Sequence, residues 1–200
     1  MKELIIATGN KGKLREIREI LKDLPLSILS MDDFFMPLPD IAETGSTFAE
    51  NAHIKAAWVY GKTGIATMAD DSGLLVDFLN GAPGVYSARF AGEGASDHAN
   101  CQKLLVALAD CPVGKRTARF ACAIEIVLSD NVSINAFGIC EGHILEQPQG
   151  GGGFGYDPLF VPDGYNQSFA ELDHSIKNSI SHRAHALAVA KAKLTEILNA

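Results

Sequence analysis

The sequence lacks the excess of basic side chains that general nucleic-acid binding requires. Its 200 residues include 24 aspartates and glutamates but 17 lysines and arginines, which gives a formal net charge of -7. Proteins that bind nucleic acids through the phosphate backbone use a basic face to displace counterions. The composition therefore predicts no nucleic-acid partner, but it is compatible with a small anion bound locally.

The sequence also lacks an apolar run of the ~20 residues that a membrane-spanning helix requires. The apolar run within residues 1–7 is too short for the core of a signal peptide. We therefore expect a cytoplasmic protein with no membrane partner.

Cysteine is scarce, and the four cysteines form no Cys-x-x-Cys pair. Cys122 lies within an apolar alternation, where a thiol behaves as a small hydrophobic side chain. We expect reduced cysteines with a structural role.

The apolar pattern predicts one globular domain over residues 1–200, because 47% of the residues are hydrophobic and 20% are charged. The expected order is strand 4–7, helix 14–24, loop 31–41, helix from 47, strand 65–69, helix around 97–108, strand 117–128, hairpin loop 129–131, strand 132–139 and a helix after residue 183. Helices alternate with strands early in the chain, whereas the middle is rich in hairpins. This order predicts an α/β fold with a mixed β-sheet flanked by helices.

Two carboxylates and a hydroxyl, Asp70, Asp71 and Ser72, follow the strand expected at 65–69. Ser72 and Gly73 predict a turn before the apolar residues resume. Because neighbouring side chains on a strand point to opposite faces, the two acids can share a ligand only if the chain bends there. The alternative is a solvated turn without chemistry.

A turn between the first strand and the first helix predicts an anion site. Free backbone N–H groups and the positive end of the helix dipole point the same way at such a turn. The glycine spacing is not that of a P-loop, and the alternative is an ordinary turn with solvated lysines. The turn consists of Thr8, Gly9, Asn10, Lys11, Gly12 and Lys13.

Thr47 and Glu50 have the spacing of a capping box at the start of the second helix. Glu50 is then engaged by the helix cap. Glu43 lies just before this helix, where it is available to a metal or a substrate. The alternative for Glu43 is a solvated carboxylate in a loop.

The glycines at 150–153 precede Phe154, Gly155, Tyr156 and Asp157. Glycines let the backbone approach a ligand, and aromatic rings offer faces on which a base can stack. The alternative is a flexible linker with Phe154 and Tyr156 as core anchors.

A basic cluster of Lys177, His182 and Arg183 precedes the final helix. His182 and His185 have no third ligand at zinc-like spacing, so we interpret the cluster as ligand contacts or helix-start hydrogen-bonding groups.

Six motifs occur in the order found in the inosine triphosphate pyrophosphatase family, which the chain resembles from end to end. They are Thr8-x-Asn10-x-x-Lys13-x-x-Glu16, Glu43-Thr44-Gly45-x-Thr47-Phe48-x-Glu50-Asn51-Ala52-x-x-Lys55-Ala56, Ala69-Asp70-Asp71-Ser72-Gly73-Leu74, Gly81-Ala82-Pro83-Gly84-x-Tyr86-Ser87-Ala88-Arg89, Phe154-Gly155-Tyr156-Asp157-Pro158 and Ser181-His182-Arg183. The resemblance implies two lobes with a nucleotide-binding cleft. It also implies a homodimer that uses Mg2+ to hydrolyse ITP, dITP and XTP to the monophosphate and pyrophosphate, clearing them from the nucleotide pool.

The resemblance further implies the residue roles. Asp71 would accept the proton of the attacking water and bind Mg2+ together with Glu43. The phosphates would lie on the 8–13 turn, with Ser72 and Lys177 nearby. The base would be surrounded by residues 154–157, His182 and Arg183.

The role of Asp70 stays open between supporting Asp71 and tuning its pKa through like-charge repulsion. We also predict that Arg183, with backbone donors, reads the 6-oxo group that distinguishes hypoxanthine and xanthine from adenine. The sequence is also compatible with two other functions: a pyrophosphatase for modified pyrimidine or other nucleotides, and a nucleotide sensor without catalysis.

Overall fold

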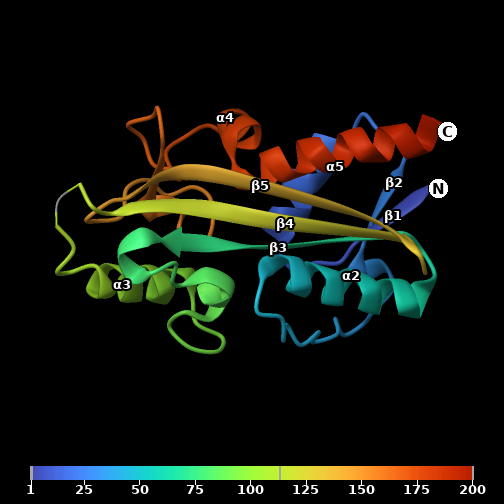
Figure 1. The fold of residues 1–200 in the computed structure, drawn as a ribbon, viewed down its shortest axis with the longest axis horizontal. Helices are drawn as coiled ribbons and strands as arrows, with labels where there is room; N and C mark the ends of the chain where they lie inside the picture. The colour runs from blue at the N-terminus through green and yellow to red at the C-terminus, as the bar shows by residue number, and fades with distance from the viewer. Residues whose placement is uncertain (1, 113, 200) are drawn as a thin grey trace. The chain divides into compact units, whose positions relative to one another are not determined.

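The computed structural model describes residues 2–112 and 114–199 (Figure 1). It has one mixed six-stranded sheet with the strand order β2-β1-β3-β4-β5-β6. β1 is parallel to β2 and β3, and β5 is antiparallel to β6. This arrangement confirms the predicted α/β class with a mixed sheet and helices. The strands are β1 (Glu3–Ile6), β2 (Ser27–Ser30), β3 (Thr67–Val76), β4 (Thr117–Ser129), β5 (Val132–Ile144) and β6 (Phe160–Pro162).

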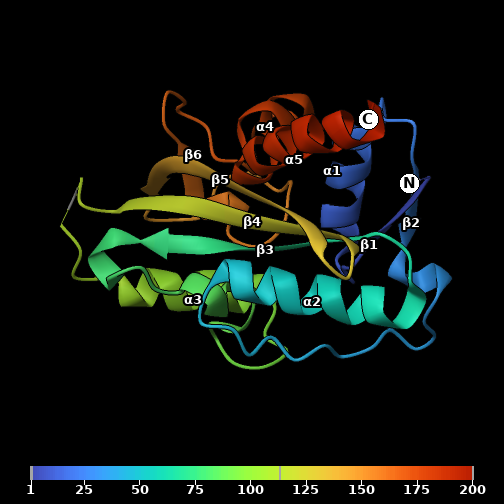
Figure 2. The same ribbon diagram turned by 45° about the vertical axis from the view of Figure 1, so that its right-hand side comes forward.

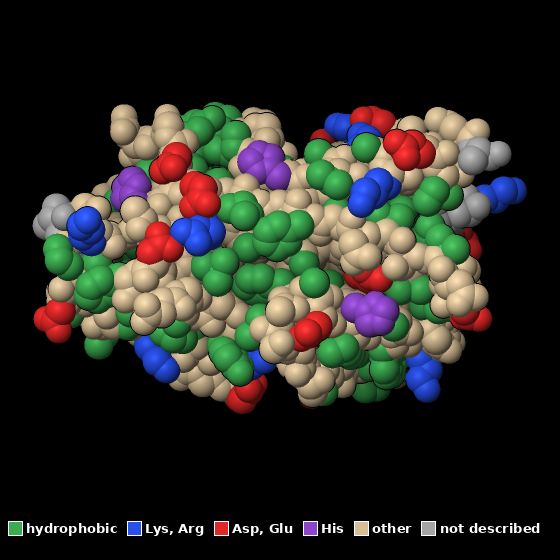
Figure 3. Space-filling view, viewed as in Figure 1, with side chains coloured by type: hydrophobic (Ala, Val, Ile, Leu, Met, Phe, Trp, Pro, Cys, Tyr) green, Lys and Arg blue, Asp and Glu red, His purple; other side chains and the backbone are tan. Residues whose placement is uncertain are grey.

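The helices vary widely in length, and none of those within the described ranges is both long and apolar enough to span a membrane. They are α1 (Lys11–Leu21), α2 (Phe48–Thr63), α3 (Asp97–Ala107), α4 (His174–Ile180) and α5 (His182–Asn199). Acidic and basic side chains are interspersed over the face drawn in Figure 3.

The chain divides into two compact units. Unit 1 comprises Met1–Asp71, Cys122–Gly138 and Arg183–Ala200, and unit 2 comprises Ser72–Ala121 and Ile139–His182. Strands β3, β4 and β5 each contribute residues to both units. The single domain over residues 1–200 and the nucleotide-binding cleft stay predictions.

In unit 1, helices cover both faces of the strands. α1 and α5 lie on one side and α2 lies on the other (Figure 2). Leu4 and Ile6 of β1 belong to one apolar cluster with α1 and α5, whereas Ile5 belongs to another with α2. This alternation explains why β1 reads as a continuous apolar run, since a strand covered on both faces is apolar on both.

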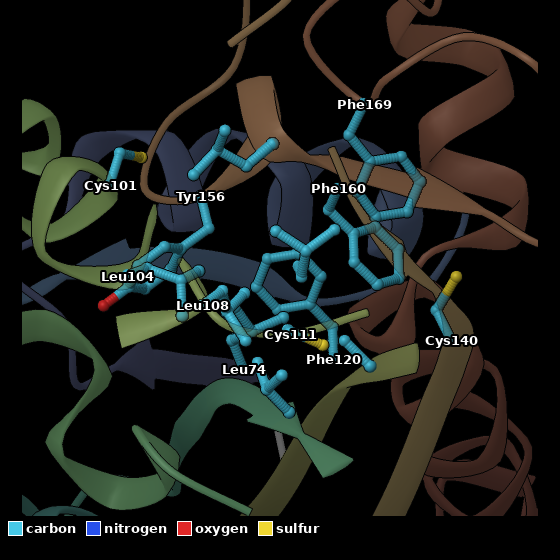
Figure 4. Packing of buried hydrophobic residues seen from close by; sticks show 14 of the residues in the cluster. Leu74, Cys101, Leu104, Leu108, Cys111, Phe120, Cys140, Tyr156, Phe160 and Phe169 are labelled. Carbon is cyan, nitrogen blue, oxygen red and sulfur yellow. The ribbon is translucent and has the colours of Figure 1, made fainter. Parts of the chain in front are cut away.

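Unit 2 has an aromatic core, part of which is shown in Figure 4. Phe120 of β4 lies edge-on to Phe160, with ring centroids 4.8 Å apart. Leu74 of β3 and Leu104 of α3 are fully buried in the same cluster. Aromatic pairs of this kind add to the stabilisation that their buried area provides.

Local side-chain chemistry fixes the starts of the first three helices. Asn10 caps α1 by accepting hydrogen bonds from the Gly12 and Lys13 amides. The predicted capping box of Thr47 and Glu50 is confirmed at α2. Ser96 and Asp97 both have side chains that can cap a helix, and Ser96 is the residue that caps α3.

Several predicted boundaries require correction. The apolar alternation of β4 predicts a half-buried strand, but β4 is buried on both faces over most of its length. β5 extends to Ile144 instead of ending at residue 139. α5 already begins at His182. Strands β2 and β6 and helix α4 were not predicted, because segments of three to seven residues are too short to show a clear period.

The largest correction concerns β3. The strand was expected to end before Asp70 and to turn at Ser72 and Gly73, but it continues from Thr67 to Val76. The acids therefore lie within a strand. Neighbouring cations make this burial possible.

All four cysteines are free and buried, as expected for structural thiols. Burial raises the pKa of Cys101 to about 11 and that of Cys122 to about 12. These thiols therefore stay protonated at neutral pH and act mainly as packing groups.

Candidate active site

The two adjacent acids of β3 have different neighbours. Asp70 is 1% exposed and contacts Lys13 of α1 and Arg183 of α5. Asp71 is 7% exposed and contacts Asn51 and Lys55, both on α2. Because β3 stays extended, the two side chains point to opposite faces of the strand. The bend that would let them share a ligand does not form.

Asp70 is the centre of a buried charge network in unit 1. The Lys13 Nζ lies 3.0 Å from Asp70 Oδ2, and the Arg183 Nε and Nη2 each lie 3.3 Å from the same oxygen. Arg183 Nη1 donates to Glu16 Oε2. Burial opposes ionisation of Asp70, but the charges of Lys13 and Arg183 outweigh it and hold the pKa of Asp70 well below its ordinary value. Asp70 is therefore a permanent anion that anchors two cations.

Asp71 has a weaker set of partners. Asn51 Nδ2 donates to Asp71 Oδ2 at 3.1 Å, and Lys55 Nζ lies 3.5 Å from Oδ1. Burial raises the pKa of Asp71 above its ordinary value, and the negative charge of Glu43 acts in the same direction. Lys55 and Lys13 oppose the shift without cancelling it. A carboxylate with a raised pKa is a better general base near neutral pH.

Lys55 connects the two predicted metal ligands. Its Nζ lies 2.7 Å from Glu43 Oε1 and 3.5 Å from Asp71 Oδ1. Burial lowers the pKa of Lys55, but the charges of Asp71 and Glu43 more than compensate, so its pKa is raised. Two carboxylates that approach one ammonium group are also placed to approach one metal cation.

Asn51 fixes the loop that carries Glu43. It is fully buried, and its Oδ1 accepts a hydrogen bond from the Gly45 amide at 2.8 Å. A Cβ at Gly45 would lie 2.7 Å from that oxygen, so only glycine fits without rearrangement. Asn51 therefore holds both the Glu43 loop and Asp71.

The predicted anion turn is shorter than expected, because α1 already begins at Lys11 instead of residue 14. Part of the hydrogen-bonding capacity of residues 8–13 is used locally. Asn10 Oδ1 accepts from the Gly12 amide at 2.9 Å and from the Lys13 amide at 3.1 Å. Thr8 Oγ1 accepts from the Asn10 amide at 3.1 Å. The phosphate contacts of residues 8–13, including Gly9 and Lys11, stay predictions.

In unit 2 the predicted base-binding residues form an ordered loop and not a flexible linker. Asp157 and Lys177 are each 3% exposed and form an ion pair of 2.6 Å. Asp157 Oδ2 also accepts from the Phe154 amide at 2.8 Å, and Lys177 Nζ lies 4.5 Å from the centre of the Phe154 ring. Gly153 has φ +76°, and a Cβ there would lie 2.1 Å from Asp157 Oδ2. The sequence of this loop thus fixes its shape.

Tyr156 and His182 lie in the core of unit 2. Tyr156 is 3% exposed and its hydroxyl donates to the Ser87 carbonyl at 2.8 Å. The His182 ring stacks on Phe120 with centroids 4.8 Å apart. The core-anchor alternative therefore describes Tyr156, whereas Phe154 and Ser72 are half-buried. Direct substrate contact by these residues stays a prediction.

The predicted site residues fall into two groups. Unit 1 contains Asp71, Glu43, Arg183 and the 8–13 turn, and unit 2 contains Ser72, residues 154–157, Lys177 and His182. No role for Glu16, Asn51 or Lys55 was predicted from the sequence. Asn51 and Lys55 lie four residues apart on α2, and this helical spacing was the signal that could have placed them on one face.

The donor set beside Asp71 fits a hard cation. Glu43 and Asp71 supply carboxylate oxygens, and Mg2+ is usually held by one or two carboxylates together with substrate phosphates. Within residues 2–112 and 114–199, no group of three or more His, Cys, Asp or Glu side chains is arranged to hold a metal. A metal at this site would therefore need ligands from a substrate or water.

Known proteins match the chain over nearly all of its length. A dITP/XTP pyrophosphatase from Desulforamulus reducens is 51% identical over 98% of this chain and 96% of the relative. One from Geobacter sulfurreducens is 49% identical over 97% of each chain. A HAM1 protein structure from Coxiella burnetii matches with a TM-score of 0.89 and 43% identity, over 98% of this chain and 100% of that one. The Ham1 family model matches residues 4–193, and the chain belongs to this family.

Proposed function

We propose that the protein hydrolyses the non-standard purine nucleoside triphosphates ITP, dITP and XTP to the monophosphate and pyrophosphate. Relatives at about half identity over nearly the full length are named dITP/XTP pyrophosphatases. The observation that carries the proposal is the arrangement of Asp71, Glu43 and Lys55, which combines a base of raised pKa with a second carboxylate and a cation.

In this mechanism Asp71 orients a water molecule for attack on the α-phosphorus and accepts its proton. In the metal-free protein its pKa is raised above the ordinary value, and general base catalysis contributes ~100- to 10,000-fold. Asn51 holds the carboxylate in place. Glu43 and Asp71 would hold Mg2+, which when bound would draw negative charge from the phosphate oxygens. The positive charge of Lys55 would offset the charge of the two acids.

The substrate contacts follow the assignment made from the sequence. The 8–13 turn, Ser72 and Lys177 would bind the phosphates, and residues 154–157, His182 and Arg183 would surround the base. Family matches over residues 4–193 span both units, so we propose one catalytic domain over residues 1–200. We also propose a cytoplasmic homodimer, and light scattering after gel filtration tests the dimer.

If Arg183 donates a hydrogen bond to the 6-oxo group of the base, its guanidinium must first give up a contact that it makes in the protein. It is 1% exposed, and its guanidinium nitrogens donate to Asp70 and Glu16. To donate to a base, Arg183 must exchange one of these carboxylate contacts for the substrate. Arg183→Ala should therefore lose the preference for ITP over ATP, and full retention of that preference would show that another group reads the base.

The test is to measure pyrophosphate and orthophosphate released from ITP, XTP, dITP, ATP and GTP, with Mg2+ and with EDTA. We expect Mg2+-dependent pyrophosphate from the first three and little product from ATP or GTP. Orthophosphate as the first product would contradict attack at the α-phosphorus. Adding modified pyrimidine triphosphates tests the alternative substrate class, and binding without turnover would indicate a sensor.

A further inference from the structure

Two side chains of helix α3 hydrogen-bond to the backbone of Gly155, which lies in the middle of the 154–157 loop. The Asp97 Oδ2 accepts a hydrogen bond from the Gly155 amide at 2.7 Å. The Cys101 thiol donates to the Gly155 carbonyl, with Sγ 3.4 Å from the oxygen. Asp97 and Cys101 are four residues apart, so they lie on the same face of α3.

Asp97 is available for this contact because another residue caps the helix. Ser96 Oγ accepts from the Ala99 amide at 3.2 Å and thereby performs the capping role. Asp97 follows in the first turn of α3, where the positive end of the helix dipole favours a negative charge. Its carboxylate can then make a charge-assisted hydrogen bond to the loop.

Cys101 is suited to donate and not to react. It is 4% exposed, and burial together with the charges of Asp97 and Asp157 raises the pKa of its thiol to about 11. The thiol therefore keeps its proton at neutral pH and remains a hydrogen-bond donor.

The residues on either side of Gly155 are held by hydrogen bonds that do not involve α3. The Phe154 amide donates to Asp157 Oδ2 within the loop, and the Tyr156 hydroxyl donates to the Ser87 carbonyl. Gly155 itself has φ +61°, in the left-handed region that favours glycine. The contacts from α3 therefore stabilise the one residue of the loop whose backbone is intrinsically the most adaptable.

We infer that Asp97 and Cys101 are positioning residues that hold the 154–157 loop in the shape that receives the purine base. The inference rests on the proposed function, because that function assigns this loop to the base. Neither residue belongs to the six motifs that identify the family resemblance. Both act through Gly155, and their expected effect is on base recognition rather than on phosphoryl chemistry.

The loop itself is tested by hydrogen exchange of the Gly155 amide. Asp97→Ala removes the acceptor and should speed this exchange by about tenfold or more. Asp97→Asn keeps an acceptor oxygen and should restore most of the protection. Ser96→Ala is the matched control, because it removes the cap of the same helix without touching Gly155 and should leave the exchange rate unchanged.

The role in recognition is tested by comparing ITP with methyl triphosphate, which has no base. Asp97→Ala should raise KM for ITP by about three- to tenfold and leave kcat nearly unchanged. Turnover of methyl triphosphate should not change. Unchanged KM for ITP, or an equal loss with both substrates, would overturn the inference.

The two measurements separate this inference from the proposed function. If the unmodified protein hydrolyses neither ITP nor methyl triphosphate, the proposed function fails and with it the role in base recognition. The exchange data then still decide whether Asp97 holds the loop. Unchanged Gly155 exchange in Asp97→Ala overturns the positioning role whatever the activity.

Discussion

The two adjacent carboxylates of β3 lie on opposite faces of the strand, and their pKa values are shifted in opposite directions. On one face, Asp70 lies against Lys13 and Arg183, and its pKa is held below the ordinary value. On the other face, Asp71 lies against Asn51 and Lys55, and burial raises its pKa. Both acids are buried, so burial alone does not explain the difference.

The number and placement of nearby cations explain it. Asp70 has two cations within 3.3 Å, whereas Asp71 has one at 3.5 Å that it shares with Glu43. The alternation of side chains along a strand keeps the two environments apart although the residues are consecutive. One acid can therefore serve as a fixed structural charge while its neighbour remains available to accept a proton.

The largest expected effect lies on the Asp71 face. Asp71→Asn removes the proposed base and should lower the rate of pyrophosphate release by ~100- to 10,000-fold. ITP binding should persist, which calorimetry can measure. Asp23→Asn is the control, because Asp23 is an exposed carboxylate paired with Lys191 and should leave activity unchanged. An Asp71→Asn protein that keeps most of its activity would rule out the proposed role.

The second largest effect is expected on the stability of the protein when Asp70 is replaced. Asp70→Asn leaves the buried Arg183 and the largely buried Lys13 without their shared anion. Breaking a buried ion pair by removing one partner costs about 3–5 kcal/mol, so the free energy of unfolding in urea should fall by about that amount. A loss below 1 kcal/mol, on the order expected for a surface pair, would show that Asp70 is not the anchor.

Without Mg2+, Asp70 and Asp71 should contribute with opposite sign to the pH dependence of the free energy of unfolding. The pKa of Asp70 is lowered by folding, so its stabilisation is complete above about pH 4 and is lost as the pH falls further. The pKa of Asp71 is raised, so ionised Asp71 destabilises the fold as the pH rises above about 4. Asp71→Asn should therefore be more stable than the unmodified protein at pH 7 and equal to it at pH 3. If Asp70→Asn and Asp71→Asn both raised or both lowered the free energy of unfolding at pH 7, the two faces would not differ as described.

The smallest effects concern the helix caps on each face. Asn10→Ala uncaps α1, which carries Lys13, and Thr47→Ala uncaps α2, which carries Asn51 and Lys55. Each should lower the free energy of unfolding by about 1 kcal/mol. Because the two caps have different hydrogen-bond partners, the free energy of unfolding of the double variant should fall by the sum of the two single losses. A clearly non-additive loss would show that the faces are coupled.

Much of the fold could be predicted from the sequence because its longer elements have clear periods. The alternation of β4 and the capping box of α2 located both elements closely. The continuation of β3 could not be predicted, because Asp-Asp-Ser-Gly has the composition of a turn. Partners distant in sequence make a strand with two buried acids stable: Lys13 and Arg183 pair with Asp70. Asn51 and Lys55 contact Asp71.

The residues of the candidate site were predicted from the sequence, but the side-chain contacts between them were not. Lys177 was assigned to the phosphates, yet it forms a buried pair with Asp157. Asn10 was assigned to an anion, yet its side chain caps α1. Such contacts depend on side-chain direction and on distant neighbours, which residue spacing does not specify.

The ion pairs of Arg183 also bear on the order in which the protein can be completed during translation. Asp70 and Glu16 precede Arg183 by 113 and 167 residues. A nascent chain therefore contains both acids long before the arginine that compensates them is synthesised. Since an unmatched buried charge is strongly destabilising, unit 1 reaches its native charge balance only when the final helix has left the ribosome. The charge balance around Asp70 and Glu16 thus depends on helix α5, which is synthesised after both of them.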